Sequence, residues 1–86
     1  MKMMSGGKFK PGAFYKHKND CCDFIEVIGI YHDNGTRADL FVSIYTQDSK
    51  GWRKLLTAAP INVSKAHYDK WESYLPRGAL RETRDL

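Results

Sequence analysis

Four side chains in this 86-residue chain could in principle be assembled into a zinc site: His17, Cys21, Cys22 and His32. Zinc sites usually carry a Cys-x2-Cys pair, because that spacing lets both sulfurs reach one ion. Adjacent side chains in an extended chain point to opposite sides, so Cys21 and Cys22 do not fit that pattern. We therefore predict no metal and no other cofactor, and we expect two reduced thiols in a loop.

Nucleophilic catalysis requires a Cys or Ser beside a base that a third group orients. His17, His32 and His67 fall in separate predicted elements, and no spacing places one of them beside a thiol. Carboxylate pairs such as Asp20 and Asp23 lie in turns or at strand ends, where solvation explains them. We predict that the chain is not an enzyme and has no catalytic residue.

Aromatic and basic side chains form a second group that could bind a ligand. Single-stranded nucleic acids and nucleotides bind where bases stack on aromatic rings while cations meet the phosphates. Here Tyr15 would stack on a base, and four cations would neutralise phosphates: Lys16, Lys18, Arg53 and Lys54. A nucleic-acid- or nucleotide-binding surface is therefore one hypothesis. Its structural alternative is that Phe14 and Trp52 belong to the core and that the lysines are solvated.

The element that must position these groups is a β-hairpin about Asn34-Gly35. This dipeptide tolerates the positive φ angles of a type I′ turn, and β-branched and aromatic residues dominate 24–31 and 40–46 on its two sides. With a two-residue loop, one face of the hairpin is almost wholly apolar and is predicted to be core. Its cross-strand pairs are Ile25/Ile44, Val27/Val42, Gly29/Leu40 and Tyr31/Ala38.

The opposite face of the hairpin mixes rings with charge. A buried face avoids charge and a solvent face seldom needs rings, so either another element half covers it or it contacts a partner. We favour a protein partner or a second copy of the chain over a nucleic acid, because this face has no basic lining. The predicted partner-binding residues are Phe24, Ile28, Phe41 and Tyr45 on this face, with Tyr68 and Trp71 from a helical stripe.

Shorter elements flank the hairpin. Strands are predicted over 13–18 and 52–57, followed by an interruption at Ala58-Ala59-Pro60 and a short edge piece at 61–63. Ser64 is the expected N-cap of a helix over 65–74 that Pro76 ends. The fold class is mainly β. We expect a small SH3-like antiparallel barrel, or a strongly bent sheet of four to five strands, with one short C-terminal helix.

Composition places this fold in a single domain. Hydrophobic residues make up 42% and charged residues 28%, as in folded globular domains. We predict a flexible N-terminus over 1–7, one domain over 8–76 and a flexible tail over 77–86. The chain has neither an apolar run long enough to span a membrane nor the middle region of a signal peptide. The expected location is cytoplasmic, without a membrane partner.

The net charge of +4 is unevenly distributed. Residues 1–18 and 50–86 are basic, whereas 19–49 are acidic. A uniformly basic surface would favour nonspecific nucleic-acid binding, and this alternation favours it less. The basic ends and the acidic hairpin can be complementary parts of one folded surface, or the basic ends can form an anion-binding patch.

Four segments in order resemble a family. They are an aromatic and basic strand at 11–18, a Glu-Val strand at 25–29, a strand ending in Tyr at 42–45 and a Gly-Trp loop at 51–53. This order is similar to that in small uncharacterised bacterial and bacteriophage proteins with an SH3-like barrel, over residues 8–76. The resemblance implies an intracellular, phage-encoded accessory protein that binds a host protein. It transfers no catalytic residue and does not include the cysteine pair.

Overall fold

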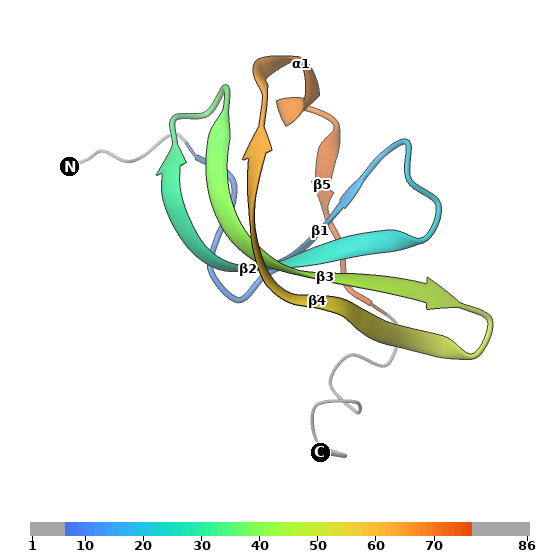
Figure 1. The fold of residues 1–86 in the computed structure, drawn as a ribbon. Coiled ribbons are helices and arrows are strands. Elements are labelled where there is room, and N and C mark those ends of the chain that lie inside the picture. Colours follow the sequence, from blue (N-terminus) through green and yellow to red (C-terminus); the bar gives the residue numbers. More distant parts are fainter. Residues whose placement is uncertain (1–6, 77–86) are drawn as a thin grey trace.

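The computed structural model describes residues 7–76, which form one five-stranded antiparallel sheet and one short helix (Figure 1). The elements are β1 (Phe14–His17), β2 (Asp23–Asp33), β3 (Ala38–Asp48), β4 (Gly51–Val63), α1 (Lys65–Tyr68) and β5 (Trp71–Ser73). In the sheet the strands follow the order β4-β3-β2-β1-β5. Figure 1 shows β2, β3 and β4 bending along their length. The predicted mainly β class with a short helix near the C-terminus is confirmed.

The sheet is not closed into a barrel. Its two edges are β4, with 13 residues, and β5, with three. Closing the barrel would require β5 to pair with β4, but a three-residue strand cannot bond to all the backbone groups of a 13-residue strand. β5 pairs instead with β1 along its whole length. The prediction of a closed SH3-like barrel is therefore wrong, whereas the alternative of an open sheet with up to five strands is correct.

The hairpin of β2 and β3 follows the predicted register only in its first half. Residues 23–27 pair with 46–42 as expected, but the register then shifts between Val27 and Gly29 and again between Ile30 and His32. Gly29 therefore faces Phe41 rather than Leu40, and Asp33 faces Ala38 in place of Tyr31. These two β-bulges each insert one unpaired residue into β2.

Asn34 explains why the loop is longer than two residues. Its backbone N–H donates to the Arg37 carbonyl at 3.2 Å, and its side-chain Oδ1 accepts the N–H groups of Thr36 and Arg37 at 2.9 and 3.0 Å. An Asn side chain that bonds to the backbone ahead of it stabilises this wider turn. Residues 34–37 thus form the loop, in place of the predicted two-residue turn.

The main core lies on the predicted face of the hairpin. Val27 and Val42 are 1% and 0% exposed, and Leu40 is also fully buried. The other buried members are Phe9, Tyr15, Ile25, Ala38, Val63 and Tyr68. Tyr31 departs from this face and is 72% exposed, because the bulge between Ile30 and His32 interrupts the alternation of side chains.

An aromatic cluster covers part of the face of the hairpin opposite the main core, which we call the reverse face. Phe24 and Tyr45 stack with ring centroids 5.2 Å apart. Three rings from elsewhere in the chain pack around this pair: Phe14 of β1, Trp52 of β4, and Tyr74 after β5. We call these five residues the aromatic cluster. It makes the reverse face a second buried layer at the end of the hairpin remote from the Asn34 loop.

The C-terminal elements differ from the prediction. α1 ends at Tyr68 instead of 74, and the Ser64 side chain makes no cap hydrogen bond. Residues 71–73 instead form β5, in which Trp71 pairs with His17 of β1. β4 runs without interruption through Pro60, although its register with β3 shifts on either side of Ile44. The predicted flexible ends lie outside the described residues, apart from Gly7.

Candidate functional site

The half of the reverse face that the aromatic cluster leaves uncovered carries exposed apolar side chains. Ile28 is 46% exposed and Tyr31 is 72% exposed. The Tyr31 ring meets the half-buried Phe41 ring edge-on, with centroids 6.2 Å apart. We call Ile28, Tyr31 and Phe41 the bulge patch. Its members lie in the half of the hairpin nearest the Asn34 loop.

The backbone of the hairpin explains the exposure of the bulge patch. Ile28 follows buried Val27, and Phe41 lies between buried Leu40 and Val42, so both side chains point away from the core. Ile28 and Tyr31 are the unpaired residues of the two bulges in β2. Regular alternation already places Ile28 on this face, whereas the second bulge moves Tyr31 away from the predicted core face.

Polar and apolar groups of β4 border the bulge patch. The exposed Pro60 pairs with Phe41 in the sheet register. Beside it, the Asn62 side-chain amide donates a 2.6 Å hydrogen bond to Asp39 Oδ1. An apolar centre with a hydrogen-bonding rim is the usual anatomy of a protein interface.

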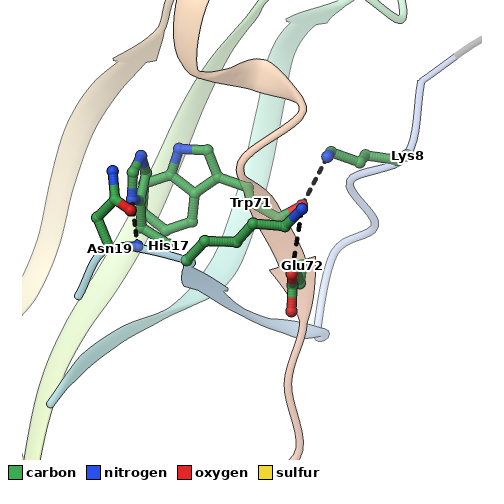
Figure 2. Close-up of polar contacts among 6 residues, drawn as sticks. Lys8, His17, Asn19, Trp71 and Glu72 are labelled. Carbon is green, nitrogen blue, oxygen red and sulfur yellow. Dashed lines mark hydrogen bonds and ion pairs between the residues drawn. The ribbon is translucent and has the colours of Figure 1, made fainter. Parts of the chain in front are cut away.

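Burial removes three of the predicted partner-binding residues from the surface. Phe24 is 1% exposed and Tyr45 is 7% exposed inside the aromatic cluster, and Tyr68 is 4% exposed in the main core. Trp71 is half-buried, and its indole ring lies edge-on to the His17 ring (Figure 2). Of the predicted hairpin residues, Ile28 and Phe41 stay accessible. The sequence did not reveal the rings that bury Phe24 and Tyr45, because one of them, Tyr74, was assigned to a helix.

Tyr15, the predicted stacking residue for a nucleic acid, is also buried, at 3% exposed. Its hydroxyl accepts the Lys10 N–H at 2.8 Å and donates to the Lys8 carbonyl at 3.0 Å. Phe9 packs edge-on against its ring, with centroids 4.7 Å apart. A base cannot stack on this ring while the chain is folded.

Three of the four predicted phosphate-binding cations line two hollows. Lys16 and Lys18 line one with Glu72, and Arg53 lines the other with Asp48. The Lys18 and Glu72 side chains form an ion pair of 3.6 Å, and Arg53 and Asp48 one of 3.7 Å. Exposed ion pairs of this kind stabilise the fold little. The acids paired with Lys18 and Arg53 nevertheless offset part of the positive charge that a phosphate would need.

Lys16 and Lys54 contact the aromatic cluster. Lys54 Nζ lies 5.6 Å from the centroid of the Tyr45 ring, and Lys16 Nζ lies 6.0 Å from that of Tyr74. Lys16 Nζ also donates to the Asp20 carbonyl. The structure thus brings part of the predicted aromatic and basic group together, with the rings packed against one another and the lysines at their margin.

His17 forms a hydrogen-bonded pair with His67. The Asn19 N–H donates to His17 Nδ1 at 3.1 Å, so the neutral His17 ring carries its proton on Nε2 (Figure 2). That Nε2–H lies 3.2 Å from His67 Nδ1 and donates to it. Burial lowers the pKa of His17, with further contributions from His67 and Lys70. A protonated Nε2 is not a metal ligand.

Lys8 is a partly buried cation on the segment before β1. Its Nζ donates to the Trp71 carbonyl at 2.6 Å (Figure 2). The same atom lies 4.7 Å from the centroid of the Tyr68 ring. Burial lowers the pKa of Lys8, and Asp69 and Asp33 partly oppose this effect. These contacts join the segment before β1 to α1 and β5. Lys8 therefore has a structural role.

The two cysteines lie in a loop, as predicted, and their sulfur atoms are side by side. Cys21 Sγ and Cys22 Sγ lie 2.7 Å apart, although adjacent side chains in an extended chain diverge. Residues 21–22 form a bend rather than an extended segment. Asp20 Oδ1 stabilises the bend by accepting the N–H groups of Cys22 and Asp23, both at 3.0 Å. The turn-forming Asp20 was the sequence signal for this geometry.

Within residues 7–76, no group of three or more His, Cys, Asp or Glu side chains is arranged to hold a metal ion. In that same part of the chain, no helix has the length and apolar character needed to cross a membrane. Comparisons of the chain with protein-family models, with curated proteins and with solved structures give no match.

Proposed function

We propose that this chain is a non-enzymatic binding module that recognises a partner protein through the bulge patch. The observation that carries the proposal is that Ile28 and Tyr31, the unpaired residues of the two β-bulges, are 46% and 72% exposed in the same half of the hairpin as Phe41. Bulges re-aim side chains and recur next to functional sites. Isolated exposed apolar residues are ordinary, but a grouped set with a polar rim is typical of an interaction surface.

The chemistry of the bulge patch favours a protein over a nucleic acid. Its three residues are two rings and one aliphatic side chain, and none of them carries a positive charge. Tyr and Phe are enriched at the centres of protein interfaces. Phosphate binding needs clustered cations, and three of the four cations proposed for it are divided between two hollows that also contain acids.

The resemblance to bacterial and bacteriophage proteins supports a bacterial host protein in the cytoplasm as the partner. The fold also supports a second copy of the chain as a competing occupant, because a patch on one face can meet itself across a two-fold axis. The two occupants differ in a measurable way, since self-association depends on the concentration of the chain alone.

The test is a pull-down from bacterial lysate with the full chain as bait, performed with and without nuclease. Ile28→Lys and Tyr31→Lys place a charge in the bulge patch. Leu75→Lys is the matched control, because Leu75 is 78% exposed and lies outside the patch. We expect one protein to be retained by the wild type and by the control, to be lost with both patch variants, and to be unaffected by nuclease.

Two outcomes would contradict the proposal. Retention that disappears after nuclease treatment would favour the nucleic-acid alternative, and equal retention by all four chains would exclude the bulge patch. Sedimentation over a range of concentrations tests the second-copy alternative. A dimer that forms in the wild type and not in Tyr31→Lys would identify the patch as a self-association surface rather than a host-protein site.

A further inference from the structure

The Cys21–Cys22 bend presents two thiols side by side at the surface. Their Sγ atoms are 2.7 Å apart, Cys21 is exposed, and Cys22 is half-buried. Neither cysteine is in the main core or in the bulge patch. The pair is therefore independent of the proposed function, and it is free to react without disturbing the packed layers.

Hydrogen bonds on both sides hold the bend in place. Asp20 Oδ1 accepts the N–H groups of Cys22 and Asp23 at 3.0 Å. On the other side, the Cys22 carbonyl accepts the Gln47 N–H at 3.1 Å. Because the backbone is fixed at Cys22, the two sulfurs remain close together without losing further chain entropy when they react.

We propose that Cys21 and Cys22 form a reversible oxidation site that low-molecular-weight disulfides convert to an intramolecular disulfide. In the first step the Cys21 thiolate attacks one sulfur of the small disulfide, forming a mixed disulfide and releasing one small thiolate. In the second step the Cys22 thiolate attacks Cys21 Sγ and releases the second small thiolate. The two cysteines together lose two electrons and two protons, and the small disulfide is reduced to two thiols.

The environment of each sulfur supports this order of attack. The hydrogen bond to Cys21 is the main cause that raises the pKa of Cys22, and burial and the Asp20 and Asp23 charges add to it. Cys22 is therefore held as a thiol, while the more exposed Cys21 meets the small disulfide first. Cys22 then acts as the resolving thiol, because it lies next to the sulfur that carries the adduct.

The geometry of adjacent cysteines makes the product easy to reduce. Consecutive Cα atoms are at most about 3.8 Å apart, whereas unstrained disulfides span about 4.4–6.8 Å between Cα atoms. Strained and exposed disulfides are easily reduced, and they serve in regulation rather than in stabilising a fold. This bond would therefore form under oxidising conditions and reopen when a thiol reductant returns.

The experiment incubates the full chain with oxidised glutathione, quenches it with acid, and measures the intact mass. We expect the wild type to lose two hydrogen atoms while remaining monomeric, and peptide mapping to place the new bond between Cys21 and Cys22. Reduced glutathione should restore the original mass. In Cys22→Ser the reaction should stop at a glutathione adduct on Cys21, at a level at least about tenfold above that in the wild type.

The wild-type measurement decides the question even if a serine variant unfolds. Accumulation of glutathione adducts on one or both cysteines without loss of two hydrogen atoms would overturn the proposal. A disulfide-linked dimer as the main product would also overturn it, because the sulfurs would then react between chains rather than with each other. Circular dichroism of Cys22→Ser confirms that its adduct forms on a folded chain.

Discussion

The Tyr68 hydroxyl donates a 2.6 Å hydrogen bond to Asp33 Oδ1, which fastens α1 to the end of β2. The same carboxylate accepts the Phe9 N–H on Oδ2 and the Gly35 N–H on Oδ1, at 3.0 and 3.1 Å. A Cβ atom on Gly7 would collide with this carboxylate, so a larger residue there would have to displace the Asp33 side chain from these hydrogen bonds. One side chain therefore ties the segment before β1, the hairpin loop and α1 together.

Tyr68→Phe should lower the free energy of unfolding by about 1–3 kcal/mol. The variant removes the hydroxyl that donates to the Asp33 carboxylate and accepts the Lys8 N–H, and a hydrogen bond to a charged group is at the upper end of the usual range. Urea denaturation measures the change. Tyr31→Phe is the control, because Tyr31 is 72% exposed. Identical unfolding curves for Tyr68→Phe and the wild type would refute this account of α1.

Alkaline pH should destabilise the fold. Burial, followed by the hydrogen bond to Asp33, raises the pKa of Tyr68 to about 12. Burial and then the bond to Glu26 raise the pKa of Tyr45 to about 12. In the unfolded chain a tyrosine titrates near pH 10, so the folded chain holds these protons more tightly. The free energy of unfolding should therefore be constant below about pH 10 and fall as the pH rises towards 12.

The measurement for this pH dependence is urea denaturation at a series of alkaline pH values. The double variant Tyr45→Phe/Tyr68→Phe should be less stable at neutral pH and should show a smaller further loss above pH 10, because it lacks two of the three phenols whose pKa is raised and keeps only Tyr15. An equal slope in the double variant and the wild type would mean that other groups govern the alkaline transition.

Mild acid should destabilise the fold through His17. Its pKa is lowered by burial and by the neighbouring His67 and Lys70, with Asp20 opposing them. The unfolded chain therefore binds the proton more readily, and stability is lost as the pH falls through the ordinary histidine pKa of about 6.5. Thermal unfolding between about pH 7 and 5 measures the loss.

Two variants separate this effect from other titrations. His17→Gln should flatten the pH dependence above about pH 5, whereas His32→Gln, at the exposed end of β2, should retain it.

Asp20 acts at a lower pH than His17, because hydrogen bonds from the Asp23 and Cys22 amides lower the pKa of its carboxyl. Its stabilisation is lost only as the pH falls below about 4. A wild-type slope in His17→Gln would assign the acid sensitivity elsewhere.

Two leucines of the hairpin sheet should respond very differently to truncation. Leu40 is 0% exposed in the main core, whereas Leu55 of β4 is 49% exposed. Leu40→Ala should lower the free energy of unfolding by about 2–5 kcal/mol, because it removes buried methyl groups and leaves a cavity. Leu55→Ala should change it by less than about 0.5 kcal/mol. Comparable losses in the two variants would contradict the assigned core.

Side-chain alternation was sufficient to predict the centre of the main core within the hairpin, but not its members from other elements, such as Tyr15 and Tyr68. Val27 and Val42 were expected to face each other inside the protein and do so, because regular antiparallel strands repeat every two residues. Alternation fails where the backbone gains an unpaired residue, and nothing in a period of two marks such a position. Tyr31 was therefore assigned to the core, although the bulge beside it exposes the ring.

Burial of a side chain by residues distant in the sequence could not be predicted from local pattern either. Phe24 and Tyr45 were expected at the surface, because the rings that cover them come from β1, β4 and the segment after β5. The helix predicted over 65–74 concealed one of these rings, Tyr74. The spacing of Tyr68 and Trp71 fits a helix, but pairing with β1 takes Trp71 into β5. Tertiary contacts therefore overrode local periodicity at this end of the chain.

The long outer edge of β4 has a consequence for solubility. A 13-residue strand at the margin of a sheet is a template on which other chains can add as fibrils. Here the positive charges of Arg53 and Lys54 repel an incoming copy at one end, and Pro60 offers no N–H to it towards the other. The register shifts beside Ile44 distort the middle of the edge. These features hinder further chains from pairing with the edge strand β4.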